Sequence, residues 1–185
     1  MLLLTAVSVA AAVPHALAQD PGSTTHSLTI ASDPAGGVRA TATLAFPAPP
    51  RIVQAILTEY RKWPELFDVR MRVAGLEERP EGVITDLYIE HALMPGERRL
   101  LCESHPLPGG GLVTDLKGGD FKRYHRVWKL KAAYDGAQTR ADFELVVEVD
   151  TIVPDWVIAM AMRRELEAHF RMVKERAMER MKKER

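Results

Sequence analysis

Hydrophobic and polar residues alternate along much of the middle of this chain. In the segment Val83–Leu93, one face of the expected strand holds Thr85, Leu87, Ile89 and the two end residues. The other face holds Asp86 and Glu90. The same alternation recurs between residues 139 and 150. A strand with this pattern has one face against a core and the other in water. The pattern therefore predicts an antiparallel sheet, covered on one side, over about residues 69–150.

Turn signals divide the chain into separate strands. Segments rich in Gly, Pro and Asp fall at 33–37, 94–97, 106–111, 118–120 and 135–136, and these residue types favour tight turns. The strands expected between them span Ser27–Ala31, Val38–Ala45, Val83–Leu93, Arg98–His105, Leu112–Lys117, Phe121–Ala132 and Thr139–Asp150.

Two segments have helical periodicity instead. Apolar residues three to four apart, from Ile52 to Tyr60, predict a helix that ends by Lys62, because Trp63 precedes a proline. A short helical turn is expected at 64–68. A second series predicts a helix over Val153–Met181, about 43 Å long at 1.5 Å per residue. Because no helix falls between the later strands, we expect an α+β fold whose antiparallel sheet is covered by the C-terminal helix.

The first eighteen residues have the features of a secretory signal peptide. Residues 2–13 carry no charge, and Ala16-Leu17-Ala18 is a small-x-small cleavage site before Gln19. A signal peptide usually begins with a basic residue, but no Lys or Arg lies between Met1 and the apolar run. Either the start lies upstream or the signal is atypical. We expect a secreted, periplasmic protein with a flexible leader at 19–26, one domain at 27–181 and a basic tail at 182–185.

Composition narrows the function classes. The 25 Lys and Arg residues balance 25 Asp and Glu residues, whereas a dedicated nucleic-acid binder usually has a basic excess. The single cysteine, Cys102, excludes an intramolecular disulfide framework and a Cys-based zinc site. The histidines show no metal-ligand spacing on a helix. The sequence therefore predicts no cofactor, no metal and no nucleic-acid partner.

Several stretches resemble the START-like superfamily, also called SRPBCC or helix-grip. They are the run from Phe46 to Phe67, the run from Phe121 to Trp128, Asp135-Gly136 and Val153–Trp156. The resemblance covers about residues 38–178 and is closest to the polyketide cyclase/dehydrase and coenzyme Q-binding branch. It implies a curved sheet that grips the long helix, with an apolar cavity between them. Arg126 stands where many relatives have glycine, which implies a narrower or more polar cavity wall.

The candidate ligand-binding residues are apolar or aromatic side chains. They lie on the faces that would line this cavity if the chain has the fold that the resemblance implies. They are Tyr60, Trp63, Phe67, Leu93, Tyr124, Trp128, Phe143, Leu145, Trp156 and Met160. The alternative for each is that it simply fills the core. Cavities for hydrophobic ligands combine such walls with a few placed polar groups.

Three polar residues complete the candidate set because they lie on faces that are otherwise apolar: His91, Arg126 and Arg163. A buried unpaired charge is costly, so an inward arginine needs a partner. Either arginine could hold a ligand carboxylate, carbonyl or phosphate. Alternatively, each could reach the cavity mouth or pair with a protein carboxylate.

The function we expect is binding of a hydrophobic small molecule (lipid, sterol or hopanoid, quinone or polyketide), with transport as an extension. The alternative is a cyclase or dehydratase that acts on a polyketide or aromatic substrate. No catalytic triad or nucleophile motif is present to favour an enzyme, although a cyclase can work by shaping its substrate. A third alternative is an interaction module with a collapsed cavity.

The C-terminal end is basic. Residues 163–185 contain nine Lys and Arg against five Asp and Glu. Such a helix end could make transient contact with anionic lipid headgroups. The alternative is a solvated end whose cations complement the helix dipole.

Overall fold

The computed structural model describes residues 25–184. The predicted signal peptide and most of the predicted leader lie outside the described residues. Within them the chain forms an eight-stranded sheet, two α-helices and one 3₁₀-helix. The strands are β1 (Thr25–Ser32), β2 (Val38–Phe46), β3 (Arg70–Glu78), β4 (Val83–His91), β5 (Met94–Pro106), β6 (Gly111–Gly119), β7 (Phe121–Ala133) and β8 (Gln138–Val149). The first strand thus begins at Thr25, inside the predicted leader.

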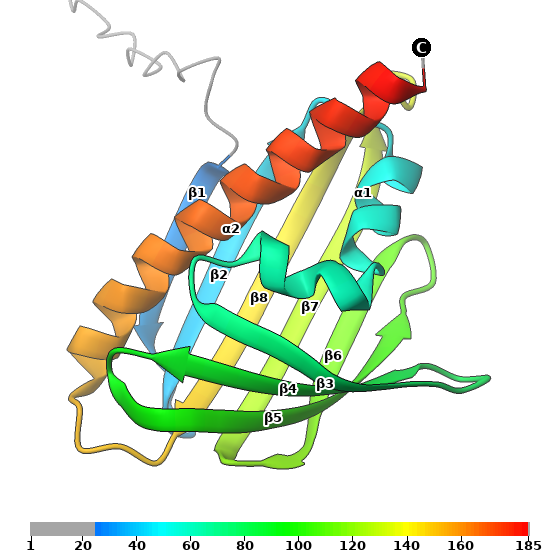
Figure 1. Cartoon of the computed structure of the whole chain (residues 1–185). Helices are drawn as coiled ribbons and strands as arrows, with labels where there is room; N and C mark the ends of the chain where they lie inside the picture. Colours follow the sequence, from blue (N-terminus) through cyan, green and yellow to red (C-terminus); the bar gives the residue numbers. More distant parts are fainter. Residues whose placement is uncertain (1–24, 185) are drawn as a thin grey trace, which may run out of the picture.

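Every neighbouring pair of strands is antiparallel, in the order β1-β2-β8-β7-β6-β5-β4-β3. The sheet is curved, and the long helix α2 (Asp155–Lys183) runs diagonally across its concave side (Figure 1). The strands β3, β4 and β5 bend around the other side of that concavity (Figure 1). The predicted α+β fold, a curved antiparallel sheet around a C-terminal helix, is therefore confirmed.

The alternation in the sequence gives the correct face for both strands that it singled out. Thr85 and Leu87 on β4 are buried, and Leu145 and Val147 on β8 point to the same concave side. A strand places successive side chains on opposite faces, so one buried residue fixes the placement of all the others.

The turn between β4 and β5 differs from the predicted turn at 94–97. The chain reverses at Ala92 and Leu93, and His91 pairs with Met94. A register shift follows, because Glu90 pairs with Glu97. Gly96 has a φ of 73°, which glycine adopts without steric cost. The Pro-Gly pair therefore forms a bulge in β5 rather than the reversal itself.

The first helix is also shorter than predicted. The helix α1 (Pro50–Leu57) ends at Thr58, whose hydroxyl donates a hydrogen bond to the Gln54 carbonyl oxygen at 3.0 Å. Side-chain bonds of this kind compete with the helical ladder. A 3₁₀-helix, η1 (Tyr60–Leu66), follows and contains Pro64. It replaces both the predicted end of the helix at Lys62 and the predicted turn at 64–68.

The second half of α2 packs on a solid aromatic core. Phe170 is fully buried, with its ring centroid 5.7 Å from Trp128 and 5.1 Å from Phe143, and both contacts are edge-on. Val173 and Ala177 are buried one and two turns further along the helix. Burying a large apolar side chain contributes about 1.5–3 kcal/mol to folding. This core holds α2 against the sheet and leaves the first half of the helix over a different environment.

Candidate functional site

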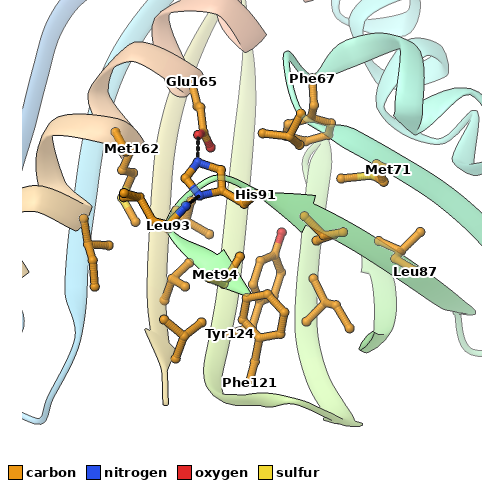
Figure 2. Close-up of a pocket in the computed structure, with 18 of the residues that line it drawn as sticks. Phe67, Met71, Leu87, His91, Leu93, Met94, Phe121, Tyr124, Met162 and Glu165 are labelled. Atoms are coloured by element: carbon orange, nitrogen blue, oxygen red, sulfur yellow. Dashed lines mark hydrogen bonds and ion pairs between the residues drawn. The ribbon is translucent and has the colours of Figure 1, made fainter. Parts of the chain in front are cut away.

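An apolar cavity of about 160 Å³ lies between the first half of α2 and the concave side of the sheet. Its walls come from η1 and the residues that follow it, from β3, β4, β5, β7 and β8, and from α2 (Figure 2). The apolar lining residues are Trp63, Phe67, Val69, Met71, Leu87, Ile89, Leu93, Met94, Leu100, Phe121, Leu145, Val147, Val149, Ile158, Ala161, Met162 and Leu166. The more polar lining residues are His91, Tyr124, Arg126, Thr151 and Glu165.

An open groove of about 880 Å³ adjoins the cavity. It runs between the β4–β5 turn and α2 and is also lined by exposed groups such as Arg70, Met160 and Arg164. The residues shared by the groove and the cavity form the cavity mouth: Val69, His91, Leu93, Met94, Ala161 and Glu165. Sites for drug-sized ligands are about 300–1,000 Å³. The enclosed part alone is smaller than that, and the groove makes up the difference.

His91 joins the two sides of the mouth. Its Nε2 meets a carboxylate oxygen of Glu165 on α2, and its Nδ1 accepts a hydrogen bond from the Leu93 amide at 3.0 Å (Figure 2). This geometry assigns the ring proton to Nε2, facing Glu165. The hydrogen bond to Glu165 raises the pKa of His91 above its ordinary value, against the opposing effect of partial burial. Both ring nitrogens are therefore engaged in contacts at the mouth.

Arg126 is an unbalanced charge in the cavity wall. The residue is 5% exposed, and its Nε has no hydrogen-bond partner among the described residues. Its guanidinium carbon lies 4.3 Å from the centroid of the Trp63 ring and 6.0 Å from that of Phe67. A desolvated cation–π contact is worth about 2 kcal/mol, whereas burying a charge costs several kcal/mol. The aromatic contacts therefore offset only part of the cost.

Trp63 is held in place by contacts on several sides. Its indole Nε1 donates a hydrogen bond to the Leu57 carbonyl oxygen at 2.9 Å, and the Tyr60 ring tilts against it at 5.0 Å. These contacts fix the indole plane on which Arg126 rests. The sequence Tyr60–Leu66 achieves this because the tighter 3₁₀ winding folds the ring back toward the end of α1.

Tyr124 lies on the same face of β7 as Arg126, and its hydroxyl points into the cavity (Figure 2). Burial raises the pKa of Tyr124 to about 12, despite the opposing charge of Arg126. The phenol is therefore neutral at physiological pH and can donate a hydrogen bond.

The concave sheet, the helix and the cavity between them can be compared with known proteins. No protein-family model matches the chain, and no curated protein matches it in sequence. A protein from Thermus thermophilus superposes with a TM-score of 0.63 at 18% identity, covering 76% of this chain and 97% of the other. A START superfamily protein from Mycobacterium smegmatis gives a TM-score of 0.59 at 15% identity, covering 76% and 97%. The Zhui aromatase/cyclase from a Streptomyces species gives a TM-score of 0.60 at 12% identity, covering 77% and 94%.

This chain has the START-like, helix-grip fold. The resemblance seen in the sequence is thereby confirmed at the level of the fold. A hydrophobic cavity between sheet and C-terminal helix is the feature that this fold leads one to expect, and the cavity is present here.

The cavity brings together seven of the thirteen predicted site residues: Trp63, Phe67, His91, Leu93, Tyr124, Arg126 and Leu145. Three others pack away from it. Trp128 and Phe143 belong to the solid core under the second half of α2. Tyr60 lies behind Trp63. For these three residues, the alternative stated above applies: they pack in the protein interior and do not line the cavity.

The remaining three predicted residues are exposed, contrary to the inward placement expected for them. Trp156 is 66% and Met160 is 63% exposed, and Met160 faces the groove rather than the cavity. Arg163 lies outside, near the Leu28 carbonyl oxygen on β1 and Glu167 on α2. The physical reason is the phase of the helix. The inward stripe through Leu166 continues backward through Met162 and Ile158, whereas the sequence interpretation followed the bulky Trp156.

Glu165 and Met71 are two of the lining residues that sequence reasoning missed. Glu165 sits beside Leu166 and three residues after Met162, so the correct helical phase would have placed it inward. Met71 lies on β3, whose boundaries the turn signals did not define. No local signal shows that β3 comes to face the cavity.

Among residues 25–184, no cluster of His, Cys, Asp and Glu side chains could hold a metal ion. Within the same part of the chain, neither helix combines the length and the hydropathy that a membrane-spanning segment needs.

Proposed function

We propose that this protein binds a hydrophobic small molecule in the cavity beneath the first half of α2, with lipids, sterols or hopanoids, quinones and polyketides as the candidate classes. The observation that carries the proposal is the apolar cavity and its continuity with an open groove. A ligand of ordinary size places one end in the cavity and the rest in the groove. The START-like fold supports the same conclusion.

The test is ligand retention by the purified protein. Native mass spectrometry and organic extraction identify a co-purifying ligand, and titration with the neutral dye N-phenylnaphthylamine measures binding to an apolar site. Ala161→Trp fills the cavity mouth from α2 and is expected to abolish dye binding. Met178→Trp adds the same ring to the same helix away from the cavity and is the matched control. A ligand-free protein that also ignores the dye contradicts the proposal.

We further infer that the protein acts outside the cytoplasm, on the strength of the signal-like residues 1–18. A fusion of these residues to a reporter enzyme that is active only after export tests this. Reporter activity is expected with the natural residues and not after Leu residues 2–4 are replaced by Asp.

For transport, exchange of the ligand is proposed to occur at the start of α2. The groove at the cavity mouth is lined there by the exposed Met160 and Arg164, and the exposed Trp156 lies in the first turn of the same helix. The basic end proposed from the sequence lies at the opposite end of α2, where Arg176 contacts Glu65 and Arg180 contacts Glu59. The measurement is dye transfer between anionic vesicles, which Trp156→Ser is expected to slow while leaving binding in solution intact.

The cyclase alternative is favoured by one observation: Tyr124 and Arg126 place polar hydrogens in the cavity. The engagement of both His91 ring nitrogens favours a structural role for that residue over proton transfer. Turnover of a polyketide substrate that is lost in Tyr124→Phe, with binding retained, would favour the enzyme.

A further inference from the structure

We propose that Arg126 is the binding site for a carboxylate, so that the ligand is a hydrophobic acid whose charged end enters the cavity first. This inference rests on the proposed function, because it names the chemical class of molecule that the same cavity takes.

The first argument is the charge of the cavity wall. Arg126 is almost fully buried, its Nε is unpartnered, and it takes part in none of the ion pairs formed between the described residues. The carboxylate that does line the cavity, Glu165, is engaged by His91 at the mouth. A buried cation without a counter-ion is unfavourable. A ligand anion would supply the missing charge.

The second argument is the geometry of the donors. The guanidinium is a planar fork that suits the two oxygens of a carboxylate. Its orientation is set by Trp63, which is itself fixed by its hydrogen bond to the Leu57 carbonyl oxygen. Tyr124 stands two residues before Arg126 on the same face of β7 and offers a neutral hydroxyl as a further donor. The site is thus organised before a ligand arrives.

The third argument is depth, which sets the direction of the ligand. Arg126, Tyr124 and Trp63 line the cavity but not the groove, whereas Leu93 and Met94 line both. The donors of Arg126 and Tyr124, which are unpaired among the described residues, therefore lie away from the groove. The polar groups at the mouth, His91 and Glu165, are already paired with each other. An acid whose carboxylate contacts Arg126 places its hydrocarbon or aromatic body along Ile89, Leu93 and Met162 toward the groove.

The experiment compares decanoate with decanol, which share the same chain and differ in the charged group. Isothermal titration calorimetry at pH 7.5 with the whole domain is expected to show decanoate binding at least about tenfold more tightly than decanol, as a hydrogen bond to a charged group implies. Arg126→Met is expected to weaken decanoate binding about 10- to 100-fold and decanol binding far less, so that the preference for the acid is lost. Arg163→Met is the matched control, because Arg163 is an exposed arginine outside the cavity.

Arg126→Met is expected to fold, because it replaces a buried charge by an apolar side chain of similar length. Arg126→Lys is the second variant: it keeps the charge without the planar fork, and it is expected to retain a reduced preference for the acid. The comparison of decanoate with decanol on the unchanged protein tests the inference even if a variant fails to fold.

Equal binding of decanoate and decanol by the unchanged protein would overturn the carboxylate proposal and leave the proposed function standing. Undiminished decanoate binding by Arg126→Met would do the same. If neither probe binds although N-phenylnaphthylamine does, this inference fails and the proposed function stands. If the dye also fails to bind, both fail.

Discussion

The imidazole of His169 on α2 lies flat against the ring of Phe67, with the ring centroids 4.2 Å apart and the planes 6° apart. Its Nδ1 donates a hydrogen bond to the Leu66 carbonyl oxygen at 2.7 Å, while its Nε2 is buried without a partner among the described residues. Burial, with a smaller contribution from the charge of Arg126, lowers the pKa of His169 to about 3, against the opposing effect of the Leu66 hydrogen bond. His169 is therefore neutral in the folded protein.

Acid should destabilise the protein through His169. The unfolded histidine has a pKa of about 6.5, so below that pH the unfolded chain binds a proton that the folded chain does not. This contribution to stability is present above about pH 6.5 and is lost as the pH falls toward 3, by up to about 1.4 kcal/mol per pH unit. Denaturant unfolding between pH 7 and pH 4 measures it, with His169→Asn expected to flatten the dependence.

Asn is chosen because its amide can keep the hydrogen bond to the Leu66 carbonyl oxygen. His105→Asn is the control, since His105 is far more exposed and its pKa is raised, first by the hydrogen bond to the Glu81 carbonyl oxygen. It should not flatten the dependence. Identical slopes for the unchanged protein and His169→Asn would contradict the account.

The His91–Glu165 pair should act in the opposite sense. The pKa of His91 is raised in the folded state, so its contribution is complete below the unfolded pKa of about 6.5 and is lost as the pH rises through the raised value. The pair is partly exposed, and we expect no more than about 1 kcal/mol. Other charged groups in the groove are Asp68, Arg70, Glu90 and Arg164.

Glu165→Gln removes the charge and keeps the shape, so its melting temperature should lie below that of the unchanged protein at pH 6 and approach it at pH 9. Arg70→Gln, which breaks the exposed Arg70–Glu90 pair, should show no such convergence. A Glu165→Gln deficit that is constant with pH would show that the histidine does not titrate against this carboxylate.

Phe170 should be among the residues most costly to truncate. Its ring is fully buried between Trp128 and Phe143, so Phe170→Ala should lower the free energy of unfolding by about 3–5 kcal/mol. Met160→Ala, on the exposed part of the same helix, should change it by less than about 0.5 kcal/mol. Urea unfolding followed by circular dichroism measures both. Similar losses for the two variants would contradict the division of α2 into a core half and a cavity half.

Gly111, where β6 begins, has a φ of 115°, and a Cβ there would lie 2.0 Å from the Trp128 carbonyl oxygen. Its amide and carbonyl groups are both hydrogen-bonded by the Gln54 side chain, at 2.7 and 3.1 Å. Gly111→Ala should therefore cost at least about 2 kcal/mol. Gly118→Ala in the same strand would meet only the Leu101 side chain at 3.8 Å and should be tolerated. Equal melting temperatures for the two variants would refute the steric argument.

The sequence predicted those parts of the fold that depend on local periodicity. The face of β8 follows from strict alternation, and the long helix follows from apolar spacing between Leu166 and Ala177. The turn at Ala92–Leu93 was missed because Pro95 and Gly96 carry the stronger turn signal and form a bulge instead. The error at this turn concerns which of two neighbouring positions a local signal acts on.

The candidate site was harder to predict because it is assembled from distant segments. Arg126 was singled out correctly as an inward charge, since it shares its face with Tyr124 on one strand. Glu165 was missed, and its partnership with His91 joins residues 74 positions apart. No local pattern encodes which helix position meets which strand. That alignment is set by tertiary contacts, such as the packing of Phe170 on Phe143 and Trp128.

The two halves of α2 have different roles. The second half packs on the aromatic core and stabilises the fold, whereas the first half covers the cavity. Amide hydrogens beside the buried Phe170 and Val173 are therefore expected to exchange with solvent only when the whole domain opens, and those before Met162 through local fluctuation. Substitutions in this first segment are therefore expected to change the shape of the cavity while the rest of the molecule keeps its architecture. A chain built in this way can acquire a new ligand without first becoming unstable.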